Sequence, residues 1–493
     1  MTTTKTSLTR QLGLGGLVAT GICSMLGASV YVVPFMIQRN VPGIGPYVLY
    51  AFLFAAVPAL LAAYAYALLS SAMPRAGGSY IFASRGLHPY LGFVASFSQW
   101  FGLSVAIGVI SYITIPFIRD TALTLDMFEF AQILDMPGVR VGLALVLLWV
   151  FVGINIRGLR SYQLTLIPMM IVMFSLGVLV IFATLHVTQE DFAQELLKHE
   201  GRQISTTVAS FHFPTFLTAA ALLFSSFIGF DSIAQAGGEA KNPKRNLPLA
   251  IAIAILGVGL YYFIFVAAVY RAVPWQFIAE EAMNKDISAP GLLSYMLPTG
   301  WAVLIIGGAA IALINDLPAM LLSVSRLMFA WAKDGIFPAS IANIHATNQT
   351  PVNALIISGG MASVGILGSH WAGDFFLGVD IMVTSMLVNF ILMCATVLSV
   401  PKRNPSLAVG MKHLSSILWQ KGIAISGILL LALFLCVHLY KDISADLQAW
   451  YYHSTPVWLI VLALASLIYW SNMRRMKQSG EEVQEKFLNL PGE

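Results

Sequence analysis

The clearest candidate for chemistry is a carboxylate that lies two residues after a glycine in a long apolar run. Residues 227–248 read FIGFDSIAQAGGEAKNPKRNLP, so Gly229 and Asp231 fall where a membrane-spanning helix should tolerate neither. An ionisable group at mid-membrane is costly, which favours a function such as taking up a proton or facing a cationic substrate. The alternative is that Asp231 caps a helix by accepting its backbone N–H groups. The two roles can coexist.

A second polar group interrupts the apolar run at residues 301–331, where Asn315, Asp316 and Pro318 occur in the sequence NDLP. Pro318 frees a backbone carbonyl one turn earlier, and Asp316 adds a hard oxygen ligand. One interpretation is therefore a site for a cation or a proton. The other is a helix kink whose polar groups pair locally.

The composition defines the elements that must position these groups. Of the 493 residues, 58% are hydrophobic and only 10% are charged, which indicates an integral membrane protein. Apolar runs long enough to cross a hydrocarbon core of about 30 Å recur along the chain. The sequence predicts twelve spans, at residues 11–37, 47–71, 90–117, 139–155, 162–185, 213–236, 247–270, 301–331, 352–371, 375–400, 422–439 and 457–470.

The basic residues predict the orientation of these spans. With the N-terminus in the cytoplasm, most of the 27 Lys and Arg residues fall in cytoplasmic segments, which obeys the positive-inside rule. Twelve spans then place both termini in the cytoplasm. The net charge of +4 is spread over many short loops, so it is a signal of topology and no nucleic-acid partner is expected. We expect a multi-pass protein of the cell membrane, surrounded by lipid.

Glycines interrupt the first and sixth spans at corresponding positions. The first span contains an expected unwound stretch at residues 23–29, including Gly27, and the sixth has Ser225, Ser226, Gly229 and Asp231 at mid-depth. Irregular backbone at membrane depth is tolerated only where it is buried in protein or lines a cavity. Glycines can instead serve close helix packing, but the matched positions of Gly27 and Gly229 favour a functional break.

The two breaks divide the chain into successive groups of five spans. Because five is odd, the second group must be inverted relative to the first, a pattern typical of secondary transporters. The predicted organisation is a cytoplasmic N-terminal segment (1–10), a first repeat (11–186), a second repeat (211–400), helices 11 and 12 (420–472) and a cytoplasmic C-terminal segment (473–493). Each break exposes N–H groups on one side and C=O groups on the other, which suits a small zwitterion such as an amino acid.

Five motifs, in order, resemble the amino acid–polyamine–organocation (APC) transporters. They are LGASVYVVP in the first span, PRAGGSYIFASRGL after the second, NIRGLR before the fifth, FIGFDSIAQAGGEAKNPKRNLP in and after the sixth, and SRLMFAWAKDGIFP at the end of the eighth. The resemblance covers residues 10 to 400. It implies an all-α, LeuT-like fold of five plus five helices with two extra helices, moving an amino acid or related amine by alternating access.

The resemblance also implies the substrate site. Family members commonly bind the substrate carboxylate through amides of a G-S-G-like segment, which falls here on Gly27, Ala28 and Ser29. They commonly hold the amino group on carbonyls of helices 1 and 6, which fall here on Met25, Ser225 and Ile228.

Two departures from the family pattern alter this expectation. Ser29 replaces the second glycine, and Ser225 stands where many relatives carry an aromatic gate. If an aromatic side chain closes the site, it must therefore be Phe224, Phe227 or Phe230, and Phe230 is also expected among the substrate-binding residues.

Coupling to an ion is predicted from the same resemblance. Relatives similar to arginine and polyamine exchangers have a carboxylate at the position of Asp231, and Asp316 is a second candidate for proton binding. Related sodium sites use hydroxyls near the end of helix 8, where Ser323 and Ser325 are available, although such a hydroxyl can bond only its own helix. Residues 162–185 lack the lysine that some proton-coupled relatives carry.

The competing classes have less support. The sequence has no Walker phosphate loop and no metal-binding spacing of His and Cys, so neither an enzyme nor a cofactor is expected. A channel would also have polar residues at mid-depth, but it has no need of paired breaks. The main alternative is a polyamine or amine transporter of the same fold.

Overall fold

The protein is described by a computed structural model that covers residues 8–185, 187–284, 287–293, 299–372, 375–411, 415–447, 449–479 and 482–492. These residues form helices and connecting loops, with no strand beyond two isolated bridges between single residues. The predicted all-α class is confirmed.

The helices follow the order of the predicted spans. Those of the first part are α1 (Leu14–Met25), α2 (Ala28–Tyr31), α3 (Val33–Asn40), η1 (Gly45–Tyr47), α4 (Val48–Ala72), α5 (Gly78–Gly86), α6 (Pro89–Thr124), α7 (Phe128–Asp135), α8 (Pro137–Ile156), α9 (Leu159–Leu185) and α10 (Gln189–Glu200). Those of the second part are α11 (Phe213–Leu223), η2 (Phe224–Phe227), α12 (Ser232–Gln235), η3 (Gly237–Glu239), α13 (Pro243–Ala272), α14 (Trp275–Asn284), α15 (Ala289–Leu293), α16 (Thr299–Lys333), η4 (Ala339–Ala342), α17 (Val352–Ala372) and α18 (Phe375–Arg403). The last are α19 (Pro405–Met411), α20 (Ile417–Ser444), η5 (Trp450–Tyr452), α21 (Ser454–Gln478) and α22 (Val483–Lys486).

The predicted spans correspond to these helices. Within the described part of the chain, 11 helices are long and apolar enough to cross a membrane, and the shorter apolar helix α1 belongs to the first span. The relation of the two five-helix groups by inversion, and the domain boundaries drawn from it, stay predictions.

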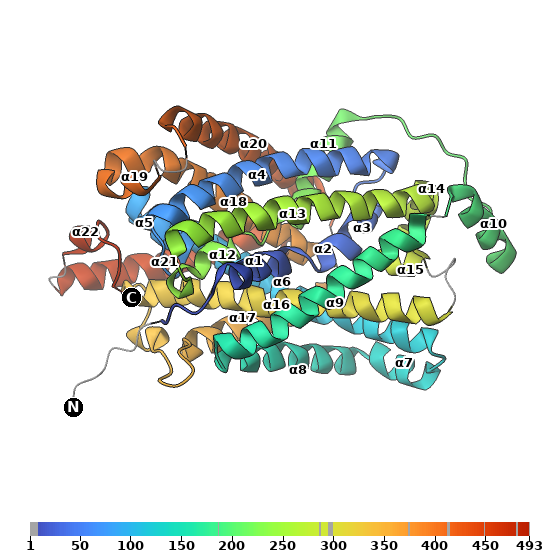
Figure 1. The fold of residues 1–493 in the computed structure, drawn as a ribbon, viewed down its shortest axis with the longest axis horizontal. Helices are drawn as coiled ribbons and strands as arrows, with labels where there is room; N and C mark the ends of the chain where they lie inside the picture. The colour runs from blue at the N-terminus through green and yellow to red at the C-terminus, as the bar shows by residue number, and fades with distance from the viewer. Residues whose placement is uncertain are drawn as a thin grey trace.

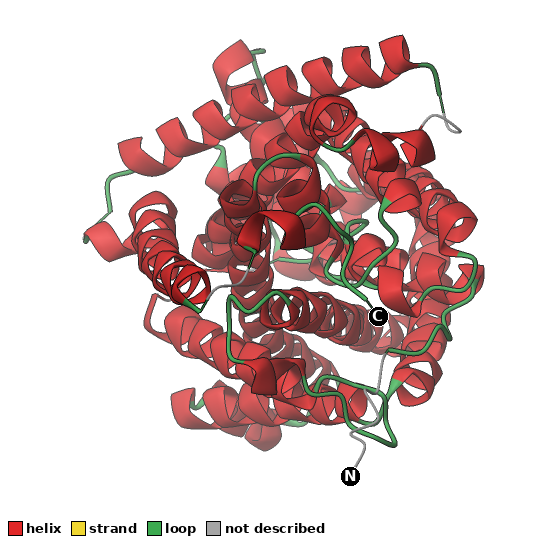
Figure 2. Ribbon diagram, turned by 90° about the vertical axis from the view of Figure 1, so that its left-hand side faces the viewer, coloured by secondary structure: helices red, strands yellow, loops and turns green. Residues whose placement is uncertain are grey.

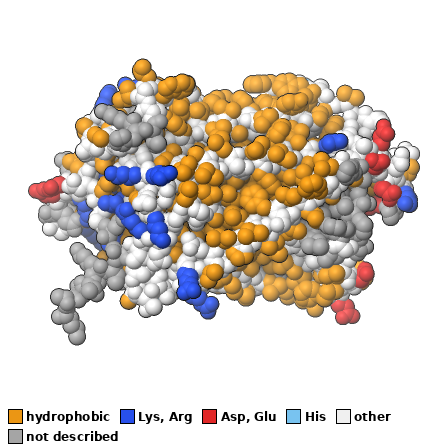
Figure 3. Space-filling view, in the orientation of Figure 1, with side chains coloured by type: hydrophobic (Ala, Val, Ile, Leu, Met, Phe, Trp, Pro, Cys, Tyr) orange, Lys and Arg blue, Asp and Glu red, His pale blue; other side chains and the backbone are white. Residues whose placement is uncertain are grey.

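The spans lie side by side along one direction, and the first and last described residues lie at the same end of the bundle, at the left in Figure 1. We call this end the terminal face. Figure 2 views the molecule from that side, with the loops of this end in front. In Figure 3 hydrophobic side chains cover the middle of the visible surface as a broad band. Most of the visible Lys and Arg side chains lie towards the terminal face.

The centre of the bundle is formed by the helices that carry or contact the breaks. Helix α6 packs against α16, α17 and α18. The most apolar windows of α6 and α16 are 83% buried inside the protein, whereas those of α8, α9, α20 and α21 are only 28% buried. An apolar helix that is buried on all sides belongs to the core, and one that exposes its apolar side chains faces lipid. The region around the two breaks is therefore surrounded by helices and does not lie at the boundary with lipid.

Both predicted helix interruptions are present, but the first is shorter than the predicted residues 23–29, because residues 23–25 remain in α1 and α2 begins at Ala28. The first span stops at Met25, passes through Leu26 with extended backbone and Gly27 at φ +143°, and resumes in α2. The sixth stops after the 3₁₀ turn η2, passes through Ile228 with extended backbone and Gly229 at φ +136°, and resumes in α12. Residues with a Cβ rarely adopt such φ values, so glycine is required at both breaks.

Candidate functional site

The two breaks touch each other at the centre of the bundle. Gly229 lies so close to Ser24 that a methyl group added at its Cα would overlap the Ser24 carbonyl, and it would also lie 2.8 Å from the Met25 Cγ atom. Across the same contact, the hydroxyls of Ser24 and Ser232 are hydrogen-bonded at 2.8 Å. Glycine at position 229 therefore has a second purpose, which is to let the backbones of the two broken helices meet.

Helix α16 approaches the first break from the other side. A methyl group added at Gly27 would overlap the carboxylate of Asp316, so this carboxylate lies directly against the gap between α1 and α2. The sequence interpretation of Asp316 as part of a site for a cation or a proton stays a prediction, and the structure places its carboxylate beside the first break. The backbone of Ala28 and Ser29 forms the first turn of α2 immediately after the gap.

A cavity lies beside the two breaks. It is lined by Ser24, Val33, Ala106, Val109, Ile110, Ser225, Ile228, Asp316, Met320, Val379 and Met382. The room available to the centres of water-sized molecules is about 30 Å³, enough for one or two waters and too little for an amino acid. Binding of an amino acid would therefore require the surrounding helices to move apart.

Ser225 is the polar group best placed to meet a ligand in this cavity. Its side chain is buried, and its Oγ has no hydrogen-bond partner among the described residues. Buried hydroxyls are almost always satisfied by protein or water. An unsatisfied hydroxyl on the cavity wall indicates a position where a ligand or a water supplies the missing bond.

The carbonyl of Met25 is not free to receive a ligand in this state, because the hydroxyl of Tyr262 donates a hydrogen bond to it. Ile228, in contrast, is a cavity-lining residue on the second break. The residues that the resemblance assigns to the amino group are thus brought together, but two of their carbonyls already have a partner, because the Ser225 carbonyl accepts the backbone N–H of Ile228 at 3.2 Å.

Asp231 is buried at the second break but does not line the cavity. Its Oδ1 accepts the backbone N–H of Gly229 at 3.0 Å, and its Oδ2 accepts a hydrogen bond from the Gln99 side chain. The capping interpretation is wrong in its detail: Asp231 stands at the N-cap of α12, but its side chain accepts no cap hydrogen bond. It instead fixes the backbone of the break that precedes the helix.

A buried hydrogen-bond network continues from Asp231 towards the terminal face, and it was not identified from the sequence. The Gln235 side chain donates to Gln99 at 3.2 Å and to Ser79 at 2.6 Å. Ser79 and Tyr66 are joined at 2.7 Å, and Asn389 donates to Tyr66 at 2.7 Å. All five side chains are buried. Isolated amides inside apolar spans were the available signal, but only the tertiary structure shows that they meet.

The three candidate aromatic gate residues pack away from the cavity. Phe227 contacts Phe52 and Tyr262, and the rings of Phe224 and Phe230 both contact Phe390. None of the three gate candidates is among the cavity-lining residues. A gating role for them stays a prediction that requires a different conformation.

The two candidate hydroxyls of α16, which is the eighth predicted span, behave differently from each other. Ser325 donates to the Leu322 carbonyl of its own helix at 2.8 Å, as the alternative interpretation allowed. Ser323 is buried, and its Oγ has no partner within the described residues. Among the described residues, no cluster of three or more His, Cys, Asp or Glu side chains is suited to a metal.

Two buried ion pairs close the terminal face beneath this site; we call them the terminal ion pairs. Arg85 bonds Asp334 through two contacts of 2.5 and 2.9 Å, and Tyr80 donates to the same carboxylate at 2.6 Å. Arg326 bonds Glu239 at 2.5 and 3.0 Å. The side chains of both pairs are at most 3% exposed. Charges buried in this way must remain paired, so one ion pair joins α5 to the end of α16 and the other joins α16 to η3.

A multi-pass helical membrane protein whose two broken helices meet at a central cavity has the architecture of an APC-type transporter. The chain belongs to the amino acid permease family, whose model matches residues 12–471. This confirms the resemblance described from the motifs. The family and the relatives below are transporters rather than enzymes.

Three relatives illustrate the range of the family. The chain is 27% identical to "Cationic amino acid transporter 4" of Mus musculus over 81% of this chain and 61% of the relative. It is 24% identical to "Branched-chain amino acid permease BcaP" of Bacillus subtilis over 81% and 83%. It is 23% identical to "Methylthioribose transporter" of the same organism over 95% and 94%. The match therefore spans about three fifths of the mouse transporter but nearly all of the last relative.

Proposed function

We propose that this protein moves an amino acid across the membrane by alternating access, and that the substrate binds in the cavity beside the two breaks. The unsatisfied hydroxyl of Ser225, buried on the cavity wall next to the second break, is the observation that carries this proposal. Family membership supports the substrate class. The small size of the cavity suits a state between two open conformations.

The proposed binding mode uses the ends of the broken helices. The substrate carboxylate binds backbone amides at the start of α2, in the segment of Gly27, Ala28 and Ser29, because free N–H groups at a helix start attract anions. The amino group binds Ser225 and the carbonyl of Ile228. Met25 contributes once Tyr262 has released its carbonyl.

Asp316 gives this site a preference for positive charge. Its carboxylate lies against Gly27, where it meets the same end of α2 that would receive the substrate carboxylate. The carboxylate of a zwitterion must therefore either displace the Asp316 carboxylate or bind beside it. A substrate with an additional cationic group gains a partner there. We propose a neutral or cationic amino acid, with Asp316 as the residue that selects between them.

Asp231 is the proposed site of proton coupling. It is fully buried, and no basic side chain forms an ion pair with it among the described residues. A buried carboxylate without a cationic partner is costly to keep ionised. Proton binding would change the hydrogen bond with Gln99 and so reach the network that leads to the terminal face. Sodium binding near Ser323 is the alternative coupling.

The protein is proposed to lie in the plasma membrane, with its terminal face towards the cytoplasm. The concentration of Lys and Arg near that face supports this orientation.

The test is uptake of radiolabelled substrates into liposomes that contain the purified protein. The panel compares neutral and cationic amino acids, a polyamine and methylthioribose, with and without proton and sodium gradients. Methylthioribose is included because that relative matches over nearly its whole length. Saturable, gradient-dependent uptake of an amino acid supports the proposal. The proposal would be contradicted if the liposomes took up only the polyamine or only methylthioribose, or if the protein conducted ions as a channel does.

A further inference from the structure

The last described segment of the chain returns to the bundle and packs beneath the terminal ion pairs. This segment, residues 482–492, is called the tail here and contains the short helix α22. Its Phe487 is only 1% exposed, whereas the neighbouring Leu488 is 48% exposed. A phenylalanine that is buried to this extent is an anchor rather than an incidental contact.

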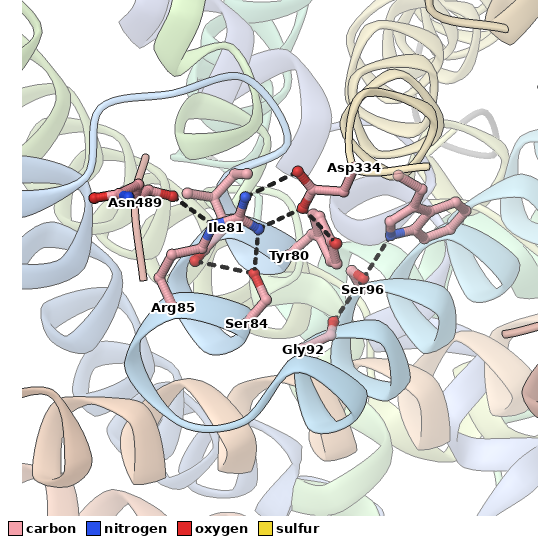
Figure 4. Close-up of polar contacts among 9 residues, drawn as sticks. Tyr80, Ile81, Ser84, Arg85, Gly92, Ser96, Asp334 and Asn489 are labelled. Carbon is pink, nitrogen blue, oxygen red and sulfur yellow. Dashed lines mark hydrogen bonds and ion pairs between the residues drawn. The ribbon is translucent and has the colours of Figure 1, made fainter. Parts of the chain in front are cut away.

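The tail binds directly to one of the terminal ion pairs. The Nε of Arg85 donates to the Asn489 carbonyl at 3.3 Å, and the Arg85 guanidinium lies 5.2 Å from the centre of the Phe487 ring. Figure 4 shows Arg85 between Asp334 on one side and Asn489 on the other. The arginine that closes the terminal face is thus held by the tail as well as by its carboxylate partner.

Two further hydrogen bonds attach the tail to different elements. Asn404, just after α18, donates to the Leu488 carbonyl at 2.8 Å. Arg75, just before α5, donates through Nε to the Pro491 carbonyl at 3.0 Å. The tail therefore bridges the α5 region and the end of α18, and through Arg85 it also reaches the end of α16. A movement that separates the α5 region from the end of α18 must therefore break at least one of the three bonds.

We propose that the tail is an autoinhibitory latch that keeps the terminal face closed and must be released before that face can open. The proposal rests on the alternating access described above, because only then does this face open. All three acceptors are backbone carbonyls, and Phe487 is the most deeply buried of the tail side chains that the structure describes, so it is the main anchor of the tail. Releasing a fully buried phenylalanine changes the ratio of closed to open protein by roughly 10- to 100-fold.

The test measures access to the cavity and needs no knowledge of the substrate. A reporter cysteine replaces Ser225, and its reaction with a membrane-impermeant maleimide is followed in vesicles with the terminal face outward. Mass spectrometry of the peptides separates this reaction from that of the three native cysteines. The unaltered tail is compared with Phe487→Ala, with a chain that ends at Ser479, and with Leu488→Ala as the matched control.

The latch predicts that Phe487→Ala and the shortened chain react at least 10-fold faster than the unaltered chain, while Leu488→Ala reacts at the original rate. A synthetic peptide of residues 482–493 should slow the shortened chain again. If the shortened chain fails to fold, Asn404→Ala replaces it, because it removes one bond to the tail and leaves the chain complete. Equal reaction rates in the folded variants would overturn the proposal, whatever the outcome of the uptake panel.

Discussion

Replacing Gly229 by alanine should disable the protein, because the substitution disturbs both the backbone and the packing at the second break. At φ +136° a residue with a Cβ is strained by about 1–3 kcal/mol. The new methyl group would overlap the Ser24 carbonyl, which belongs to the backbone and cannot rotate away, and overpacking of this kind costs about 1–3 kcal/mol. Together these effects destabilise the native break by about 2–6 kcal/mol.

At about 1.4 kcal/mol for each factor of ten, this free energy corresponds to a loss of roughly 30-fold or more in the population with both breaks correctly formed. The assays are the initial rate of amino acid uptake into liposomes and thermal unfolding in detergent. The matched control is Gly257→Ala in α13, where nothing lies within 4 Å of the added methyl group. In a helix interior this control should stabilise by about 0.5–1 kcal/mol. If Gly229→Ala transports and unfolds like Gly257→Ala, the proposed contact between the two breaks is not needed for function.

The remaining predictions concern three other groups. If Asp231 binds the coupling proton, uptake by the unaltered protein should fall as pH rises, and uptake by Asp231→Asn should be independent of pH. The control Asp446→Asn, at an exposed position, should keep the original dependence of uptake on pH. An unchanged pH dependence in Asp231→Asn would remove that residue from coupling. Ser225→Ala should raise the KM for uptake about 5- to 10-fold, with kcat little changed, because it removes one hydrogen bond of about 1 kcal/mol or slightly more. An unaltered KM would place the substrate elsewhere. Arg85→Ala should destabilise the protein by about 3–5 kcal/mol because it leaves the buried Asp334 carboxylate without its cationic partner. Adding Asp334→Ala should restore much of this stability. Equal unfolding temperatures for the single and double variants would contradict the pairing.

Much of the fold could be predicted because its signals are local. Each span is an apolar run whose length matches the membrane, and its hydrogen bonds are satisfied within the helix, so it can be identified without knowledge of its neighbours. The breaks at Gly27 and Gly229 were predictable for a similar reason, since a glycine flanked by polar residues weakens a helix wherever it occurs. The resemblance to the family then placed the expected substrate site at both breaks.

The contents of the site depended on contacts between distant parts of the chain. Asp231 and Asp316 were both identified as candidates, but the sequence could not show that Asp316 faces the first break while Asp231 faces Gln99, 132 residues away. The same holds for Arg85 and Asp334, which are 249 residues apart. A sequence pattern reports which face of a helix is polar, but not which helix will meet it.

The sequence by itself determined that this chain spans a membrane many times, where its first and sixth spans break, and to which family it belongs, because each of these can be read from local stretches of the chain without knowing how they pack. The tertiary structure alone decided which carboxylate reaches the cavity, which hydroxyl is left unsatisfied there, and that the tail binds Arg85. These features arise from the packing of helices against one another, where a small rotation of one helix changes the partner of every polar group on it.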